Sequence, residues 1–155
     1  SAARSIALLS YRNYNTYNAT QQETNLNKVT DFASSSYQRY QGEKLVKRFN
    51  AYSYVRLSEA MDSHNVARNR TEAVEHALAS IKTKTLVVGI SSDLLFPVAE
   101  QQFLSKHIPN AQYNEIDSFY GHDGFLLETQ QLTEIINNFY SSQKTNTLKN
   151  KLALI

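Results

Sequence analysis

The chain has 155 residues, of which 41% are hydrophobic and 19% charged, and its formal net charge is +2 at pH 7. Basic and acidic residues are interleaved, without the clustered lysines and arginines of a nucleic-acid-binding surface. There is no cysteine, which excludes disulfides and thiolate metal sites. No apolar run approaches the ~20 residues that a membrane-spanning helix needs. We therefore expect one globular domain that binds neither nucleic acid nor membrane.

The first part of the chain is predicted to be helical. Apolar residues at helical spacing predict helices over 2–14, 33–49 and 52–63. The Asn-rich segment 13–30 is expected to be a loop or a ragged helix end, and Thr71 is expected to cap a short helix over 72–81. The chain begins inside an amphipathic pattern without a start methionine, which fits a fragment and equally a processed or tagged start.

The second part alternates between strands and helices. The compact run TLVVGI over 85–90 predicts a strand that is buried on both faces, and 112–116 predicts a second strand. A helix over 98–107 is entered through Pro97, which suits the first helical position. A long helix over 124–141 is expected to close the domain. Such alternation implies a parallel sheet covered by helices, and two strands are too few to complete one.

Three regions follow from this pattern. They are a helical region over 1–75, a strand–helix region over 76–142 and a tail over 143–155.

The first motif that could take part in catalysis is SSDLLFP, directly after the TLVVGI strand. Functional groups of open α/β sheets collect in the loops beyond the carboxyl ends of the strands. A carboxylate such as Asp93 can accept a hydrogen bond from an imidazole N–H there and hold the ring in one tautomer. Taken alone, Asp93 is better explained as a turn residue that ends the strand.

The second motif is YGHDGF, directly after the second predicted strand. It places His122 between two glycines in a tight turn, where a neutral imidazole can act as a general base near pH 7. Taken alone, His122 is equally well explained as a surface histidine in a turn. Asp93 precedes His122 by 29 residues, and each follows one of two successive strands. This is the chain order of the acid and base in a Ser-Asp-His triad of an α/β-hydrolase. No histidine spacing typical of a metal site competes with this interpretation.

The nucleophile of such a triad is absent from the sequence. A nucleophile elbow requires G-x-S-x-G or a small-residue variant, and no serine here has glycines at that spacing. An attacking serine would have to lie on other sequence or on another chain.

Four further segments resemble the homoserine O-acetyltransferase family, in order along the chain. They are ARSIALLSYR at 3–12, YQGEKLVKRF at 40–49, AMDSH at 60–64 and EIDSFYGHDGFLLE at 115–128. The resemblance covers nearly the whole chain but only the C-terminal half of the family's sequence. It implies the C-terminal part of an α/β-hydrolase fold, in which the helical region 1–75 is a lid and 76–142 contains the last strands and helices of the core.

The resemblance also implies roles for individual residues. Asp93 would be the triad acid and His122 the base, Arg4 and Tyr11 would hold the substrate carboxylate, and Asp123 its ammonium group. A zwitterionic amino acid requires both a cation and a carboxylate in its site, which agrees with these assignments. Arg4 and Tyr11 lie seven residues apart on one helical face, so either Arg4 would have to fold back to reach Tyr11 or the helix would have to break. Packing of Tyr11 under the lid and N-capping by Asp123 are the structural alternatives.

By this resemblance the complete protein would be a cytoplasmic homodimer, joined through the lid, that transfers an acetyl group from acetyl-CoA to L-homoserine in methionine biosynthesis, without a cofactor or metal. The fragment alone would be inactive because the nucleophile is missing. Succinyl transfer, L-serine as acceptor and ester hydrolysis remain as alternatives, and so does a non-catalytic interaction module. The run NVARNR at 65–70 departs from the family, which has two glycines in this turn, so a reshaped turn is expected there.

Overall fold

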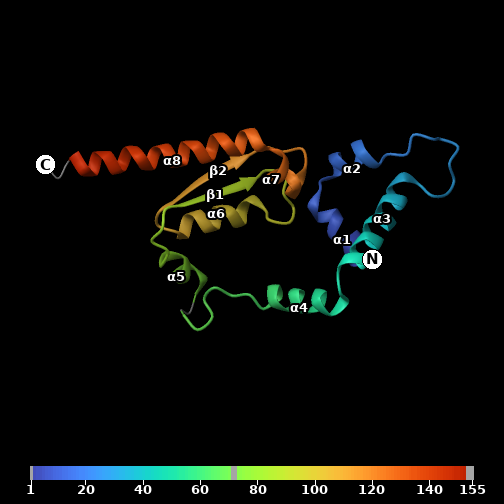
Figure 1. The fold of residues 1–155 in the computed structure, drawn as a ribbon, viewed down its shortest axis with the longest axis horizontal. Helices are drawn as coiled ribbons and strands as arrows, with labels where there is room; N and C mark the ends of the chain where they lie inside the picture. The colour runs from blue at the N-terminus through green and yellow to red at the C-terminus, as the bar shows by residue number, and fades with distance from the viewer. Residues whose placement is uncertain (1, 71–72, 153–155) are drawn as a thin grey trace.

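The computed structural model describes residues 2–70 and 73–152. Four helices form its first part, namely α1 (Ala2–Tyr11), α2 (Tyr14–Gln21), α3 (Ala33–Arg48) and α4 (Ala51–Asp62). Figure 1 shows α1, α2 and α3 grouped together, while α4 runs back toward the second part of the chain. Helix α1 packs against α3, and its Leu8 is buried.

Helix α2 lies within the Asn-rich segment that was expected to be a loop or a ragged helix end. Asn13 caps this helix, because its side-chain oxygen accepts a hydrogen bond from Thr16 N at 2.9 Å. The Thr16 side chain is buried and its hydroxyl also donates to the Phe119 carbonyl. This polar helix is therefore held by its cap, by the contact of Thr16 with a distant loop and by Tyr17, whose hydroxyl donates to Leu8 O at 2.8 Å.

The second part is a small α/β unit. It contains α5 (Val74–Ala79), β1 (Thr85–Ile90), α6 (Val98–His107), β2 (Ala111–Ile116), the 3₁₀ turn η1 (Gly121–Asp123), α7 (Gly124–Leu127) and α8 (Thr129–Leu152). Strands β1 and β2 pair in parallel, from Thr85 opposite Ala111 to Ile90 opposite Ile116. These are the only two strands among the described residues.

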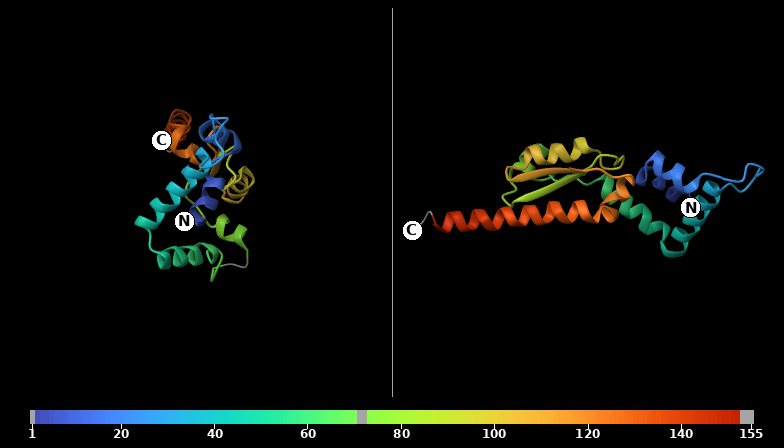
Figure 2. Two further views of the ribbon diagram at one scale, coloured as in Figure 1. Left: turned by 90° about the vertical axis from the view of Figure 1, so that its right-hand side faces the viewer. Right: turned by 90° about the horizontal axis from the view of Figure 1, so that it is seen from above.

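Helices cover both faces of the sheet. Figures 1 and 2 show α6 along one face and α8 along the other. The buried residues of this unit include Leu78 of α5, Val87 and Ile90 of β1, and Ile116 of β2. Strand β1 is thus an apolar run in the interior, as its composition predicts.

The carboxyl ends of both strands point toward the helical part. The β arrows of Figure 1 run toward α1 and α2, and α1 packs directly against η1. The loops that follow β1 and β2 therefore lie between the sheet and the first helices, and this position determines the site.

Several predicted boundaries differ from the structure. Thr71, the expected helix cap, lies outside the described residues, and α5 begins at Val74. Pro97 is the N-cap of α6 instead of its first helical residue. The expected closing helix is divided at Glu128 into α7 and α8. Helix α8 also continues to Leu152, through most of the expected tail.

The turn that departs from the family is built around Asn69. Its φ of +60° is the left-handed conformation that glycine adopts most easily. Asparagine tolerates this conformation better than other residues with a side chain. Ala67, in the same turn, is buried and its N–H donates to the Asn65 side chain. The turn thus forms without glycines.

Candidate active site

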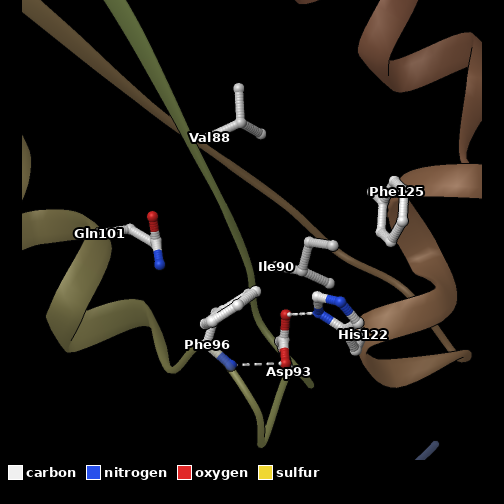
Figure 3. Close-up of a pocket in the computed structure, with 7 residues that line it drawn as sticks. All are labelled: Val88, Ile90, Asp93, Phe96, Gln101, His122 and Phe125. Atoms are coloured by element: carbon white, nitrogen blue, oxygen red, sulfur yellow. Dashed lines mark hydrogen bonds and ion pairs between the residues drawn. The ribbon is translucent and has the colours of Figure 1, made fainter. Parts of the chain in front are cut away.

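The site lies where the loops after β1 and β2 meet. Ser91 N donates to Ile116 O at 3.0 Å, so the two backbone segments remain paired where the strands end. The SSDLLFP loop then carries Asp93, and the YGHDGF turn carries His122. Figure 3 shows both side chains beside the end of β1, facing one another.

Asp93 is held firmly by its own loop. It is 7% exposed, and its Oδ1 accepts hydrogen bonds from Leu95 N at 2.8 Å and Phe96 N at 2.9 Å. This is the local turn that aspartate favours after a strand. The second oxygen, Oδ2, is left to face His122.

His122 is bonded to Asp93 through its Nδ1, which lies 2.8 Å from Asp93 Oδ2. The hydrogen bond that the sequence predicts between these residues is therefore present. An ionised carboxylate can only accept, so this contact assigns the proton of neutral imidazole to Nδ1 and leaves Nε2 as the basic atom. Among the described residues, nothing forms a hydrogen bond with Nε2.

Aromatic rings surround the imidazole. Tyr11 stacks on it at a centroid distance of 5.7 Å, Phe96 meets it edge-on at 5.0 Å, and Phe125 lies at 5.2 Å. The His122 side chain keeps 18% of its surface exposed. It borders a cavity of about 190 Å³ that is lined by Val88, Ile90, Asp93, Phe96, Gln101, His122 and Phe125. The base thus has an apolar surrounding with one open side.

Gly121 allows the His122 turn to approach the helical part. Its φ is +63°, and a Cβ there would lie 3.1 Å from both Tyr11 O and Asn13 N. A side chain would therefore be strained by both conformation and contact. This close backbone approach brings the Tyr11 ring against His122.

Arg4 and Tyr11 form a pair on α1. The guanidinium carbon of Arg4 lies 5.2 Å from the centre of the Tyr11 ring, so Arg4 folds back along the helix. Both residues line a second cavity of about 390 Å³, which also includes Arg48 and Tyr54. Neither His122 nor Asp123 lines this second cavity. Tyr11 therefore contacts both the second cavity, which it lines with Arg4, and the His122 ring.

Asp123 binds a residue that the sequence analysis did not identify. Arg12 Nε lies 3.2 Å from Asp123 Oδ2, and the same guanidinium lies over the Tyr37 ring at 5.9 Å. Asp123 occupies the N-cap position of α7 but its side chain forms no capping bond, so the expected capping contact is absent.

The described residues contain neither a cluster of metal-ligating side chains nor a membrane-spanning helix. No three His, Asp or Glu side chains there could together hold a metal ion. No helix in that part of the chain is both long enough and apolar enough to cross a bilayer.

Proteins of known family are similar to this chain along most of its length. No protein-family model matches the chain. A homoserine O-acetyltransferase from Cyclobacterium marinum is 50% identical over 138 residues, which cover 89% of this chain and 39% of that protein. The chain thus spans about two fifths of the length of this relative. The predicted resemblance is confirmed: along most of its length the chain is related to the homoserine O-acetyltransferases.

Solved structures establish the fold. A homoserine O-acetyltransferase from Bacillus anthracis matches with a TM-score of 0.77 at 17% identity, over 89% of this chain and 39% of that chain. A crystal structure of an esterase matches with a TM-score of 0.74 at 18% identity, over 89% and 40%. The predicted fold class is confirmed, since the chain folds as part of an α/β-hydrolase with its helical segment.

Proposed function

We propose that this chain supplies the acid and the base of a homoserine O-acetyltransferase, within a longer protein whose other residues supply the nucleophilic serine. The observation that carries this proposal is the bond between Asp93 Oδ2 and His122 Nδ1, at 2.8 Å, on two loops beyond the carboxyl ends of adjacent parallel strands. It is the geometry in which a carboxylate orients a catalytic imidazole.

The reaction would proceed in two acyl transfers. His122 Nε2 takes the proton of the serine hydroxyl as the serine oxygen attacks the thioester carbonyl of acetyl-CoA. The C–S bond breaks, the sulfur leaves with the proton from His122, and an acetyl-serine ester remains. Nε2 then takes the proton of the homoserine hydroxyl, whose oxygen attacks this ester. O-acetylhomoserine leaves, and the serine oxygen recovers the proton.

Asp93 would act throughout as the partner of Nδ1. Its carboxylate keeps the imidazole in one tautomer and stabilises the imidazolium that forms in each transfer. The backbone donors at Leu95 and Phe96 hold Oδ1, so Asp93 can serve His122 without reorientation.

Recognition of the acceptor would use charges on both sides of His122. Arg4 and Tyr11 line a cavity on one side and would receive the substrate carboxylate. Asp123 directly follows the base and would receive the ammonium group through Oδ1, because Arg12 already occupies Oδ2. The Tyr11 ring, stacked on His122, would lie between the carboxylate and the ammonium group of the acceptor.

The rest of the fold would come from the remainder of the protein. The sheet has two strands among the described residues. About half or more of the surface of several large apolar side chains near the site is exposed, namely Leu94, Phe96, Phe125 and Leu126. Further strands and the elbow serine would cover this surface. Residues 1–75 would form the lid, 76–142 the end of the core and 143–155 the terminal segment, and the lid would join two copies in a cytoplasmic homodimer.

A second candidate is ester hydrolysis, which the structural likeness to an esterase favours. Water would then replace homoserine as the acceptor in the second transfer. Arg4 and Asp123 would have no charged ligand in such an enzyme, and for this reason we prefer the amino-acid acceptor.

Product analysis would test the proposal. The complete protein is incubated with acetyl-CoA and either L-homoserine, L-serine or buffer alone, and the products are identified by mass spectrometry. A parallel set contains succinyl-CoA. We expect O-acetylhomoserine as the main product, with free acetate in trace amounts. Acetate alone would establish an esterase, and O-succinylhomoserine or O-acetylserine a sister activity.

The chain by itself provides a second test. The purified 155 residues should release no CoA above a His122→Ala control, because they lack the attacking hydroxyl and the oxyanion donors. Adding the remaining part of the protein should restore turnover. Turnover by the isolated chain would reveal a nucleophile within it and would overturn the proposed mechanism.

A further inference from the structure

Ser92 joins the loop of the acid to the loop of the base. Its hydroxyl donates to Ser118 O at 2.6 Å and accepts from Gly121 N at 3.2 Å. Ser92 directly precedes Asp93, and Gly121 directly precedes His122. The two hydrogen bonds therefore connect the backbone beside the imidazole to the backbone beside the carboxylate.

The hydroxyl of Ser92 suits this place because it donates and accepts at once. Ser118 and Gly121 are buried, so water has little access to the two backbone groups. Ser118 also orders the same loop from within, since its Oγ accepts from Tyr120 N at 3.0 Å. Without the Ser92 hydroxyl, a buried N–H and a buried C=O on the His122 loop would lose their partners.

The loop between β2 and η1 is thus held from two sides. On one side, the backbone of 11–13 lies against Gly121, and Thr16 donates to Phe119 O. On the other side, Ser92 of the β1 loop bonds to Gly121 N, directly before His122, and Asp93 bonds to the imidazole itself. The distance from Asp93 Oδ2 to His122 Nδ1 depends on both loops keeping their positions relative to one another.

We propose that Ser92 is a positioning residue for the Asp93–His122 pair, which it keeps aligned by bonding to the loop that carries the base. It touches no substrate and transfers no proton. The inference rests on the proposed function for its effect on turnover, and on geometry alone for its effect on the imidazole.

Ser91 provides a matched control. It is the adjacent serine, and its Oγ also bonds across to the β2 loop, where it donates to Asp117 Oδ1 at 2.6 Å. That bond joins two exposed side chains and does not involve the backbone of the His122 turn. Ser91→Ala and Ser92→Ala thus remove the same atom from neighbouring positions and differ in what the hydroxyl holds.

The experiment compares Ser92→Ala, Ser92→Cys, Ser92→Thr and Ser91→Ala in the complete protein. Ser92→Cys keeps the shape with a weak donor and acceptor, and Ser92→Thr keeps the hydroxyl. Steady-state kinetics give kcat and KM for homoserine, and ¹⁵N chemical shifts of the His122 ring give the fraction of the Nδ1–H tautomer. Thermal unfolding establishes that each variant is folded.

We expect Ser92→Ala and Ser92→Cys to lower kcat by about tenfold to a hundredfold, the scale of a small misplacement of a catalytic group. KM should stay within about twofold, and the ring should become a mixture of tautomers, while Ser92→Thr and Ser91→Ala behave as wild type. Wild-type kcat and tautomer in Ser92→Cys would overturn the proposal, and so would an equal loss in Ser91→Ala. If the wild type has no acetyltransferase activity, the proposed function fails, and the tautomer measurement still decides the role of Ser92.

Discussion

Arg12 and Asp123 join the end of α1 to the residue after the candidate base, with Nε 3.2 Å from Oδ2. Their side chains are each 28% exposed, so water screens this pair only in part. The guanidinium also lies over the Tyr37 ring of α3. Asp123 is therefore fixed by the helical segment, with Oδ1 free to meet a cationic group.

Removing Arg12 should weaken acceptor binding through Asp123. In the complete protein, we expect Arg12→Gln to raise the KM for homoserine by about fivefold to tenfold, since a charge-assisted bond of this kind contributes about 1 kcal/mol. The KM for acetyl-CoA should stay unchanged. Arg39→Gln is the control, because Arg39 of α3 forms an exposed pair with Asp31, which lies before that helix.

A double-mutant cycle makes this prediction specific. If Arg12 acts through Asp123, Arg12→Gln should have no further effect in an Asp123→Asn background. Additive effects of the two changes would show that Arg12 acts elsewhere and would refute the link.

Asn69 should be sensitive to what replaces it. At φ +60°, Asn69→Ala should lower the free energy of unfolding by about 1 kcal/mol, because alanine tolerates the left-handed conformation less well. Asn69→Gly should be neutral or slightly stabilising. Urea unfolding of both variants gives the comparison. Ala67→Gly, at a buried position of the same turn without positive φ, should be destabilising. Equal stability of Asn69→Ala and Asn69→Gly would contradict the assigned conformation.

Glu23 should order its loop only while it is ionised. The hydrogen bond from Lys28 is the main cause that lowers the pKa of Glu23 from 4.5 to about 2, and the backbone N–H of Asn25 adds to it. A depressed pKa means that the ionised form stabilises the fold above pH 4.5 and that this contribution is lost as the pH falls toward 2. Carboxyl ¹³C shifts measured by NMR should show this titration, and Lys28→Gln should raise the midpoint. A wild-type midpoint at 4.5 would contradict the contact.

The sequence predicted the α/β part of the fold more closely than the helical part. The strand over 85–90 and the helix over 98–107 agree with the structure at both ends. A β-branched run between turn residues has few other conformations open to it. Helix α2 was assigned to a loop or helix end because its residues have no apolar stripe. Its order comes from the Asn13 cap and from the hydrogen bond of Thr16 to Phe119 O on a distant loop, which local patterns do not reveal.

The site was predictable where chain order reflects geometry. Asp93 and His122 each follow a parallel strand, and neighbouring strands bring such loops together, so their hydrogen bond could be expected. Arg12 and Ser92 could not be found in this way. Their partners lie 111 and 26 or 29 residues away, and nothing in a sequence specifies which side chain reaches which loop.

The central claim is that Asp93 and His122 are the acid and base of acetyl transfer, and its most direct test is kcat/KM of the complete protein with these residues changed. We predict that Asp93→Asn lowers kcat/KM for acetyl-CoA and homoserine by about 10⁴-fold, and that His122→Ala lowers it at least as much. His76→Ala, on the exposed side of α5, should retain wild-type activity. If either Asp93→Asn or His122→Ala keeps more than about a tenth of the wild-type kcat/KM while folded, the pair is not the catalytic couple, and the account is wrong.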